Sequence, residues 1–269
     1  MPPDVKVAMA SSPGHAGRSN EDFVGAVPRA MVLLDGAGIP DTEDICHHGV
    51  AWYSHTLGAA VLGRLPLADG ADLSAVLAEC IELVSDEHRH SCDIADPSSP
   101  QSTVAIIRFA EDNLDYLVLA DSYVVLDRPD AQPTVVTDPR ELAVRGKCLA
   151  PLAGLTAGTP DYENALPGVI DALRARRNQP GGYWIAKDDP EAAMEAVTGS
   201  VPCGGLSGAA LLSNGASRIV DPYRLADWPA VAELLRTSGP AELLRRVREV
   251  EESDRTVQAD DASAAYVAP

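Results

Sequence analysis

Runs of apolar residues along the chain follow two patterns, which predict strands and helices. Short apolar runs rich in β-branched or small residues predict strands. We expect these strands at 5–8, 22–27, 30–34, 102–109, 116–126, 134–137, 182–186, 209–213 and 263–267. Apolar residues that recur at every third or fourth position predict helices. We expect these helices at 49–65, 72–88, 166–177, 227–237 and 240–252, with one more that begins at Asp189-Pro190 and is closed by Gly199.

The order of these elements indicates how they pack. Strands and helices do not alternate along the chain, which disfavours a doubly wound parallel sheet. A β-rich body interrupted by helix pairs near each end fits two antiparallel sheets packed together, with helices outside. The range 1–269 can bury a substantial core as a single domain, and 46% of its residues are hydrophobic. The range 139–182 is loop-like apart from one helix, and we expect it to form a flap.

Charge narrows the classes of partner. Lys and Arg number 21 against 40 Asp and Glu, so the formal net charge is −19. Such a surface repels the phosphate backbone of nucleic acids and anionic lipid, so we expect neither nucleic acid nor a membrane as a partner. It suits a protein that gathers divalent cations, although acidic surfaces also keep many proteins soluble.

Cysteine usage and apolar segments indicate the compartment. The five cysteines are odd in number and widely scattered, which argues against a disulfide framework and for a reducing compartment. No apolar run approaches the roughly 20 residues of a membrane span. The range 1–10 lacks the basic stretch and long apolar core of a secretory signal. We therefore expect a cytoplasmic protein.

Acidic residues fall at the ends of the predicted strands. Glu21-Asp22 opens one strand, Asp35-Gly36 ends another, and Asp260-Asp261 precedes the last. Asp121 lies within the strand expected at 116–126. Strand ends can converge in a compact domain, and clustered carboxylates repel one another unless cations neutralise them. Oxygen ligands of this kind favour Mg²⁺ or Mn²⁺ over zinc. Each acid alone is more simply a turn residue or a cap, so only the set indicates a metal site.

Six short segments make this indication more specific. In chain order they are Arg18-Ser19-Asn20-Glu21-Asp22, Leu34-Asp35-Gly36-Ala37-Gly38, Gln101-Ser102-Thr103-Val104-Ala105, Leu119-Ala120-Asp121-Ser122, Leu212-Ser213-Asn214-Gly215 and Asp260-Asp261-Ala262-Ser263. Their order and their places at strand edges resemble the motifs of the protein phosphatase 2C family, which are metal-dependent Ser/Thr protein phosphatases. No single segment is specific, but the resemblance runs from about Gly14 to the C-terminus. The segments at 20–23 and 182–184 resemble a divergent actinobacterial branch of that family.

The resemblance implies a four-layer αββα sandwich of two antiparallel sheets flanked by helices, with a two-metal centre in a cleft at one end. It implies that Asp35 bridges two Mg²⁺ or Mn²⁺ ions and that the Gly36 carbonyl joins it. Asp121 would contribute to a third, looser ion, and Arg18 would clamp the substrate phosphate. The other implied ligands are Glu21 and Asp260, which bind one ion each, and Asp22, which holds metal-bound water. The paired ions would generate a bridging hydroxide for in-line displacement at phosphorus, with no phosphoenzyme.

Three positions depart from the family pattern. Asn214 stands where the second Asp-Gly motif of the family has Asp. Its amide oxygen can ligate a metal but brings no negative charge, so the ion that it helps to hold should bind more weakly. Arg18 lies three residues before Glu21, where many relatives have four. Ala37 stands where some relatives carry a His thought to protonate the leaving group, a task for which His47-His48 could substitute.

The residues support three functional hypotheses. The first is a Mg²⁺- or Mn²⁺-dependent phosphomonoester hydrolase that acts on phosphoserine or phosphothreonine in proteins. The second is a catalytically weakened pseudophosphatase that binds a phosphorylated partner or a small phosphate ester, and Asn214 favours it. The third keeps the enzyme but makes its substrate a small metabolite phosphate. Selectivity among substrates would lie in the flap and loops near 139–182.

A second set of metal-ligating residue types lies at 88–92. His88, His90 and Cys92 alternate, which on a strand would place all three on one face. A zinc site normally has four ligands, and the fourth is evident only if Asp93 or Cys46 comes near. A polar helix end followed by a turn is therefore favoured over metal binding.

Two further groups have simple interpretations. Cys203-Gly204-Gly205 has no oriented His partner, so a plain loop is favoured over a nucleophile loop. Arg174, Arg176 and Arg177 complement the dipole at a predicted helix end, and this is favoured over recognition of an anionic substrate.

Overall fold

Two sheets form the frame of this computed structural model, which describes residues 6–38, 44–68, 70–129, 131–156, 158–254 and 257–268. Within these ranges each sheet has five strands, and every neighbouring pair is antiparallel. The first sheet has the order β2 (Phe23–Val27), β3 (Ala30–Ala37), β4 (Gln101–Ala110), β5 (Asn113–Leu119) and β8 (Val197–Pro202). The second sheet has the order β1 (Lys6–Ser12), β10 (Ala262–Ala268), β9 (Gly208–Leu212), β6 (Tyr123–Asp127) and β7 (Thr134–Val136).

The first sheet is covered on both faces, and β3 shows why its sequence is apolar throughout. Alternate side chains of a strand point to opposite faces. Leu33 belongs to the core between the two sheets. Leu34 packs instead with the helices above the first sheet, which are α1 (Gly49–Arg64), the short 3₁₀ helix η1 (Leu65–Leu67) and α2 (Leu73–His88). Burial on both faces demands an unbroken apolar run.

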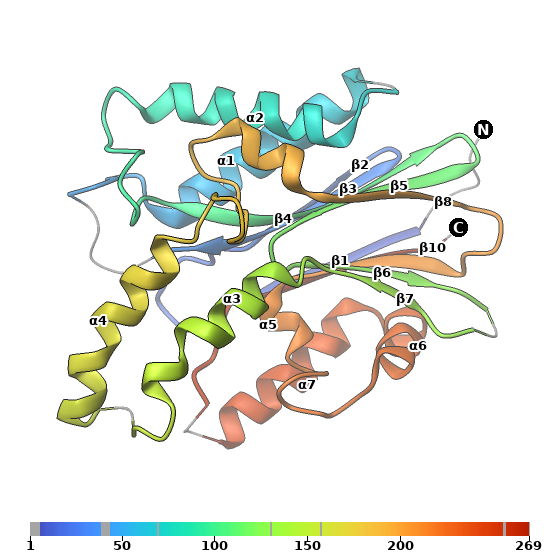
Figure 1. Cartoon of the computed structure of the whole chain (residues 1–269). Helices are drawn as coiled ribbons and strands as arrows, with labels where there is room; N and C mark the ends of the chain where they lie inside the picture. Colours follow the sequence, from blue (N-terminus) through green and yellow to red (C-terminus); the bar gives the residue numbers. More distant parts are fainter. Residues whose placement is uncertain are drawn as a thin grey trace.

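The outer face of the second sheet is covered by the C-terminal helices. These are α5 (Asn214–Ser217), α6 (Trp228–Ser238) and α7 (Pro240–Ser253). Leu244 of α7 packs in one core cluster with Ala264 of β10. The layers are therefore helices, sheet, sheet and helices (Figure 1). The predicted αββα sandwich is confirmed.

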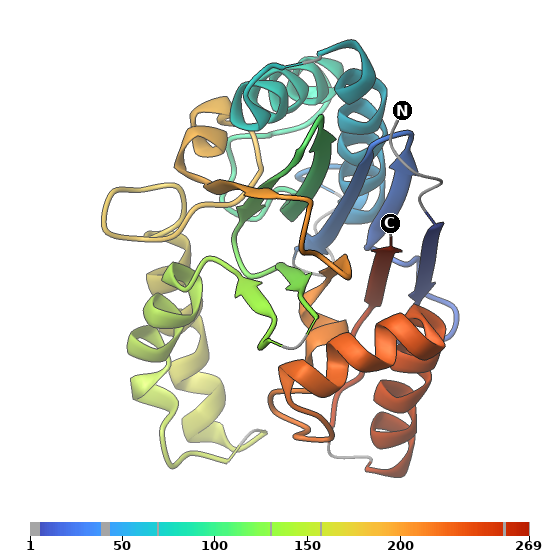
Figure 2. The same ribbon diagram turned by 90° about the vertical axis from the view of Figure 1, so that its right-hand side faces the viewer.

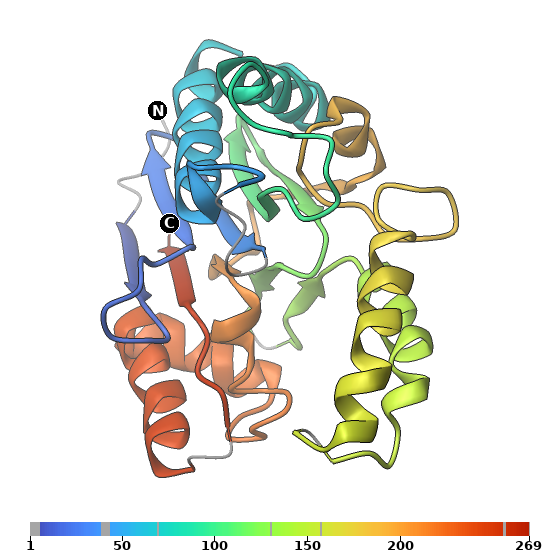
Figure 3. The same ribbon diagram turned by 90° about the vertical axis from the view of Figure 1, so that its left-hand side faces the viewer.

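A pair of helices, here called the α3–α4 pair, lies beside one end of the sandwich. Helices α3 (Arg140–Cys148) and α4 (Pro160–Arg174) run side by side, connected through the 3₁₀ helix η2 (Ala150–Leu152) (Figures 2 and 3). They fall in the range predicted as a flap. Of the residues in these two helices, only Val169 is fully buried. Across the described residues, no helix has the length and apolar character needed to cross a bilayer.

The strand predicted at 116–126 is instead two strands in different sheets. β5 ends at Leu119 and β6 begins at Tyr123. Ala120 between them has φ +64°, a conformation that non-glycine residues rarely adopt, and it turns the chain out of the first sheet. Asp121 therefore lies in the crossing between the sheets and not within a strand.

The strand predicted at 182–186 is wrong. Only isolated bridges form there, one between Ala186 and Ser102 and one between Tyr183 and Arg177. The side chain of Asn178 explains this, because its Nδ2 donates to Ile185 O at 3.0 Å and its Oδ1 accepts from Ile185 N at 2.8 Å. A side-chain amide thus takes the backbone hydrogen bonds that a neighbouring strand would make.

The helix predicted from Asp189-Pro190 to Gly199 is mostly wrong. Asp189 does cap a helix, but that helix is the short 3₁₀ segment η3 (Pro190–Glu195). The chain then enters β8, which pairs with β5. Gly199 lies within β8, where a Cβ would come 2.2 Å from the Tyr116 hydroxyl. This glycine makes room for a ring on the neighbouring strand and does not close a helix.

The residues at 88–92 do not form a strand. His88 is the last residue of α2, and a turn follows in which Cys92 N donates to His88 O at 2.9 Å. His90 is exposed. The favoured interpretation of the local structure, a helix end followed by a turn, is confirmed.

Candidate active site

Asp35 lies where β3 leaves the core. The strand continues past its predicted end as far as residue 37, and Asp35 is paired with Thr103 of β4. By alternation Asp35 shares the face of Leu33, which is turned toward the second sheet. Asp35 N donates to Thr103 Oγ1 at 3.3 Å, and Ser102 Oγ donates to Asp35 O at 2.9 Å. The strand therefore carries this carboxylate to the opening between the sheets.

Asn214 joins the second sheet to this carboxylate. It follows β9, whose Leu211 belongs to the core between the sheets, and it begins α5. Its backbone N donates to Asp35 Oδ2 at 2.9 Å, and its side-chain Nδ2 donates to Asp121 Oδ2 at 2.9 Å. The amide lies against two of the residues that sequence predicts as metal ligands.

Two glycines let the backbones of the motifs touch. A Cβ on Gly36 would lie 2.5 Å from the carbonyl oxygen of Glu21. A Cβ on Gly215 would lie 2.0 Å from the carbonyl oxygen of Asp261. Both distances are far below normal contact, so any side chain would push the segments apart.

The Asp260-Asp261 pair enters from the segment before β10. Asp261 accepts hydrogen bonds from Gly14 N at 2.7 Å and from Glu21 N at 2.6 Å, which ties the N-terminal segment to the site. Asp260 is exposed, and its Oδ2 accepts from Arg218 Nη2 at 2.6 Å. Sequence reasoning gave neither Asp261 nor Arg218 a role here.

Glu21 and Asp22 complete the acid cluster. Burial raises the pKa of Glu21, and the charges of the Asp260-Asp261 pair raise it further. Asp22 is 4% exposed, and burial raises its pKa to about 7, although the nearby hydroxyls of Ser213 and Ser263 lower it. Among the described residues, neither carboxylate oxygen of Asp22 has a hydrogen-bond partner of ordinary geometry.

The acids repel one another. Burial raises the pKa of Asp35 well above its usual value, and three neighbouring carboxylates add to the effect. Burial also raises the pKa of Asp121, whereas the charge of Arg145 and the amide of Asn214 lower it. Charged carboxyl groups held this close repel one another. A divalent cation bound between them attracts each one and so outweighs that repulsion.

This donor set fits Mg²⁺ or Mn²⁺. Among the described residues, the two buried oxygens of Asp22 have no hydrogen-bond partner of ordinary geometry, and a cation or its bound water would satisfy them. Every available donor is an oxygen, the ligand that these hard ions prefer. The groups that could hold ions are the side chains of Glu21, Asp22, Asp35, Asp121, Asn214 and Asp260 and the Gly36 carbonyl.

Asp35, Asp121 and Asp260 open onto a cleft of about 410 Å³. Its lining includes five of the predicted site residues, which are Asp35, Gly36, Asp121, Asn214 and Asp260. It also includes four arginines, which are Arg145, Arg174, Arg177 and Arg218. Arg145 and Arg174 come from the α3–α4 pair, and Arg174 Nε is buried without a hydrogen-bond partner among the described residues.

The other two predicted acids, Glu21 and Asp22, are not among the described residues that line the cleft. Arg18 is exposed and close enough to lower the pKa of Glu21, but it is not among the described residues that line the cleft. Ala37 does line the cleft. His47-His48 lies at the start of α1, and the described lining contains no histidine. The structure therefore brings neither of these two histidines to the cleft as a leaving-group acid.

Two arginines of the cleft escaped sequence reasoning. Arg218 could have been found, because it lies four residues after Asn214, one helical turn along a segment that follows a motif. Arg145 lies on α3, a helix with no buried residue and hence no apolar stripe to reveal it.

No protein-family model and no curated protein matches this sequence. Solved structures do match over nearly the whole chain. The serine/threonine phosphatase PstP/Ppp of Mycobacterium tuberculosis is 19% identical with a TM-score of 0.61, over 98% of this chain and 98% of that one. The chain has the protein phosphatase 2C fold.

Two further structures share the protein phosphatase 2C fold with this chain. The serine/threonine phosphatase Stp1 of Staphylococcus aureus is 13% identical with a TM-score of 0.61, over 98% of this chain and 95% of that one. The catalytic domain of PstP in complex with two manganese ions is 19% identical with a TM-score of 0.60, over 98% of this chain and 97% of that one. The structural likeness establishes the fold. At identities this low it says nothing of the chemistry, which depends on the residues of the cleft.

Proposed function

We propose that this chain is a Mg²⁺- or Mn²⁺-dependent phosphomonoester hydrolase. The observation that carries the proposal is that Asp35 of the first sheet and Asp121 of the crossing between the sheets meet at Asn214, which donates to both at 2.9 Å. Acids from distant parts of the chain are held together against their repulsion at the rim of an open cleft. A site for divalent cations explains that arrangement.

The proposed roles of the acids are those that the resemblance to the protein phosphatase 2C family implies. Asp35 lies between the segments and would bridge two ions, with the Gly36 carbonyl beside it. Glu21 and Asp260 would bind one ion each, and Asp22 would orient water with its unpartnered oxygens. When bound, the ions would supply an activated water nucleophile and offset the charge that develops during in-line displacement at phosphorus.

The arginines of the cleft supply the second half of the chemistry. A phosphate monoester carries up to two negative charges, and a planar guanidinium group can donate two parallel hydrogen bonds to its oxygens. Arg145 lies close enough to lower the pKa of Asp121. Arg174 pairs with Asp171 through Nη1, but its buried Nε has no hydrogen-bond partner in the part of the chain that the structure describes. These two arginines are better placed to clamp the phosphate than Arg18, which lies outside the cleft lining.

We propose phosphoserine or phosphothreonine in a protein as the substrate. The solved structures that share the fold are described as serine/threonine phosphatases, which favours this class. The cleft is open and is flanked by the α3–α4 pair, whose exposed surface could contact a polypeptide on either side of the phosphate. A small metabolite phosphate is the alternative substrate.

A pseudophosphatase is the second candidate, and two contacts favour it. The Asn214 side chain donates a hydrogen bond to the Asp121 carboxylate, and Arg218 forms an ion pair with Asp260. Both contacts reduce the need of the site for a cation. Such a protein would bind a phosphorylated partner with little turnover.

Hydrolysis of a chromogenic phosphate ester, and then of phosphoserine and phosphothreonine peptides, tests the proposal. We expect hydrolysis that depends on Mn²⁺ or Mg²⁺ and is lost in Asp35→Asn. This variant keeps an oxygen acceptor for the backbone N–H of Asn214. The matched control is Asp86→Asn, an exposed acid on α2. Metal-independent hydrolysis, or equal rates for Asp35→Asn and Asp86→Asn, would overturn the proposal. Phosphopeptide binding without turnover would favour the pseudophosphatase.

A further inference from the structure

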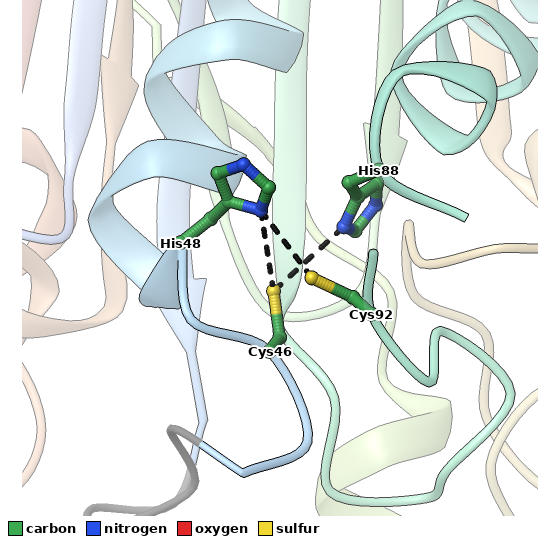
Figure 4. A group of neighbouring side chains, drawn as sticks. All are labelled: Cys46, His48, His88 and Cys92. Atoms are coloured by element: carbon green, nitrogen blue, oxygen red, sulfur yellow. Dashed lines mark hydrogen bonds between the residues drawn. The ribbon is translucent and has the colours of Figure 1, made fainter. Parts of the chain in front are cut away.

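Outside the acidic cleft, four side chains meet at one end of the α1–α2 hairpin. Cys46 and His48 come from the segment that leads into α1. His88 is the last residue of α2, and Cys92 lies in the turn after it. One ligand atom from each side chain lies within 4.8 Å of all the others. Figure 4 shows the four side chains pointing toward one another from these two segments.

The distances between these atoms match those of a tetrahedral zinc site. Zinc lies about 2.3 Å from a thiolate sulfur and about 2.0–2.1 Å from an imidazole nitrogen, so tetrahedral angles place sulfur and nitrogen ligands about 3.6 Å apart. His48 Nδ1 lies 3.9 Å from Cys46 Sγ and 3.4 Å from Cys92 Sγ. His88 Nδ1 lies 3.7 Å from Cys46 Sγ.

Hydrogen bonding alone accounts poorly for the cluster. A neutral ring nitrogen can donate or accept one strong hydrogen bond, yet His48 Nδ1 faces two sulfur atoms. Thiols are also weak donors and weak acceptors. A single ion at the centre would satisfy all four groups at once.

The surroundings hold the ligands in place. Cys46 is 2% exposed and His88 is 3% exposed. The ring of Trp52 stacks on His48 with 4.2 Å between centroids and lies 5.0 Å from the ring of His88. Asp93 N donates to Ile45 O at 2.9 Å, which joins the two ligand-bearing segments next to the cluster.

The form of the ligands also fits a metal. Two thiolates and two imidazoles suit zinc, and four protein ligands leave no open position for a substrate.

We propose that Cys46, His48, His88 and Cys92 bind one structural Zn²⁺ ion. The ion would fasten the start of α1 to the end of α2. Binding would release protons from the two thiols, because zinc binds the thiolate form. The proposal is independent of the phosphatase chemistry, since none of the four residues lines the acidic cleft.

Zinc content of the full chain tests the proposal. The protein is expressed with zinc, purified under reducing conditions without a histidine tag, and analysed by inductively coupled plasma mass spectrometry. We expect about one zinc per chain in the wild type and in His90→Ala, an exposed neighbour outside the cluster. We expect Cys46→Ser and Cys92→Ser to lose that zinc and to melt at least about 5 °C lower. Asp35→Asn should keep it, which separates this site from the cleft.

A spectroscopic probe keeps the test valid if the cysteine variants fail to fold. Co²⁺ bound to the wild-type chain should give the visible bands of a tetrahedral ion and a thiolate-to-cobalt charge-transfer band. X-ray absorption of the zinc protein should show two sulfur and two nitrogen neighbours. A reduced wild-type chain that takes up no zinc, a Cys46–Cys92 disulfide that persists under reductant, or equal zinc in Cys46→Ser and the wild type would overturn the proposal.

Discussion

The acidic cleft and the Cys/His cluster (Cys46, His48, His88 and Cys92) gather ligands in opposite ways. The cleft draws oxygen donors from many segments and from both sheets, and it stays open to solvent. The Cys/His cluster draws sulfur and nitrogen donors from two segments of one helical hairpin, and two of its members are almost fully buried. Hard donors in an open cleft suit an exchangeable ion that meets a substrate. Soft donors in a closed cluster suit an ion that stays with the fold.

Removal of metal ions by a chelator should show the largest difference between the acidic cleft and the Cys/His cluster. We expect EDTA to abolish phosphatase activity by removing Mg²⁺ or Mn²⁺ from the cleft, and Mn²⁺ to restore it. Zinc in the Cys/His cluster should leave much more slowly, because two of its four ligands are almost fully buried. Metal analysis and hydrolysis of a chromogenic ester, followed on the same samples, check this. Loss of zinc and activity in one step would contradict the separation.

Replacing Asn214 by Asp should make the acidic cleft more negative and leave the charge of the Cys/His cluster unchanged. Asn214→Asp places a carboxylate against Asp121, where an amide now donates a hydrogen bond. We expect Mn²⁺ affinity to rise and activity to rise by at least roughly tenfold, which corresponds to about 1.4 kcal/mol. The metal-free protein should lose stability because of the added repulsion.

The control for this substitution is Asn113→Asp, which adds the same charge at an exposed strand start. Calorimetry with Mn²⁺ and steady-state hydrolysis measure the two effects. If Asn214→Asp binds Mn²⁺ no better and hydrolyses no faster than Asn113→Asp, then Asn214 is not at a ligand position.

The arginines of the cleft should show a smaller effect. We expect Arg145→Ala to lower kcat/KM several-fold, because it removes a cation beside the acids and leaves the oxygen ligands in place. Arg18→Ala should lower it less, since Arg18 lies outside the cleft lining. Steady-state kinetics on both variants compare the two positions. A larger loss in Arg18→Ala would return the phosphate clamp to Arg18.

The smallest expected effect is the pH dependence that the acids of the cleft give to the free energy of unfolding. In the folded chain the pKa of Asp22 is about 7 and those of Asp35, Glu21 and Asp121 are raised, whereas unfolded carboxyl groups titrate near about 4. Between these values the folded state binds more protons than the unfolded state. The contribution of these acids to the stability of the protein without Mg²⁺ or Mn²⁺ should therefore rise as the pH falls from about 7 toward about 5.

Denaturant unfolding in the presence of EDTA measures this trend. Asp35→Asn should flatten it, because removing one charge lowers the pKa of the remaining acids. Mn²⁺ should remove it by stabilising the charged carboxylates. The same pH dependence of the free energy of unfolding in the wild type and in Asp35→Asn would contradict the assignment of repulsion to the cleft.

Sequence patterns predicted most strands and helices of the two sheets and their covering layers, because buried positions recur along the chain with the period of each element. Asp72 accepts a hydrogen bond from Ser74 N as the predicted cap of α2, and the apolar run at 30–34 corresponds to a strand covered on both faces. The pattern missed α3, which buries no residue. It also mistook 182–186 for a strand, because a side-chain amide at Asn178 replaces the strand partner.

The two clusters differ in how far sequence could reveal them. The acids follow motifs at strand edges, so their convergence could be anticipated, but the contacts of Arg145 and Arg218 depend on packing. The Cys/His cluster had a usable signal. Cys46 and His48 precede one predicted helix, and His88 and Cys92 end the next, so an antiparallel hairpin brings the four together. The alternation of His88, His90 and Cys92 instead predicts that His90 belongs to the same group, whereas His90 is exposed.

Calorimetric titration with Mn²⁺ tests the central claim most directly, that Asp35 organises a site for divalent ions. The titration uses zinc-loaded protein, so that only the cleft is available to Mn²⁺. We expect the wild type and Asp86→Asn to bind Mn²⁺ alike, and Asp35→Asn to bind it at least roughly tenfold more weakly, because a neutral amide cannot hold two cations as a carboxylate does. The same isotherm for Asp35→Asn and the wild type would contradict the account.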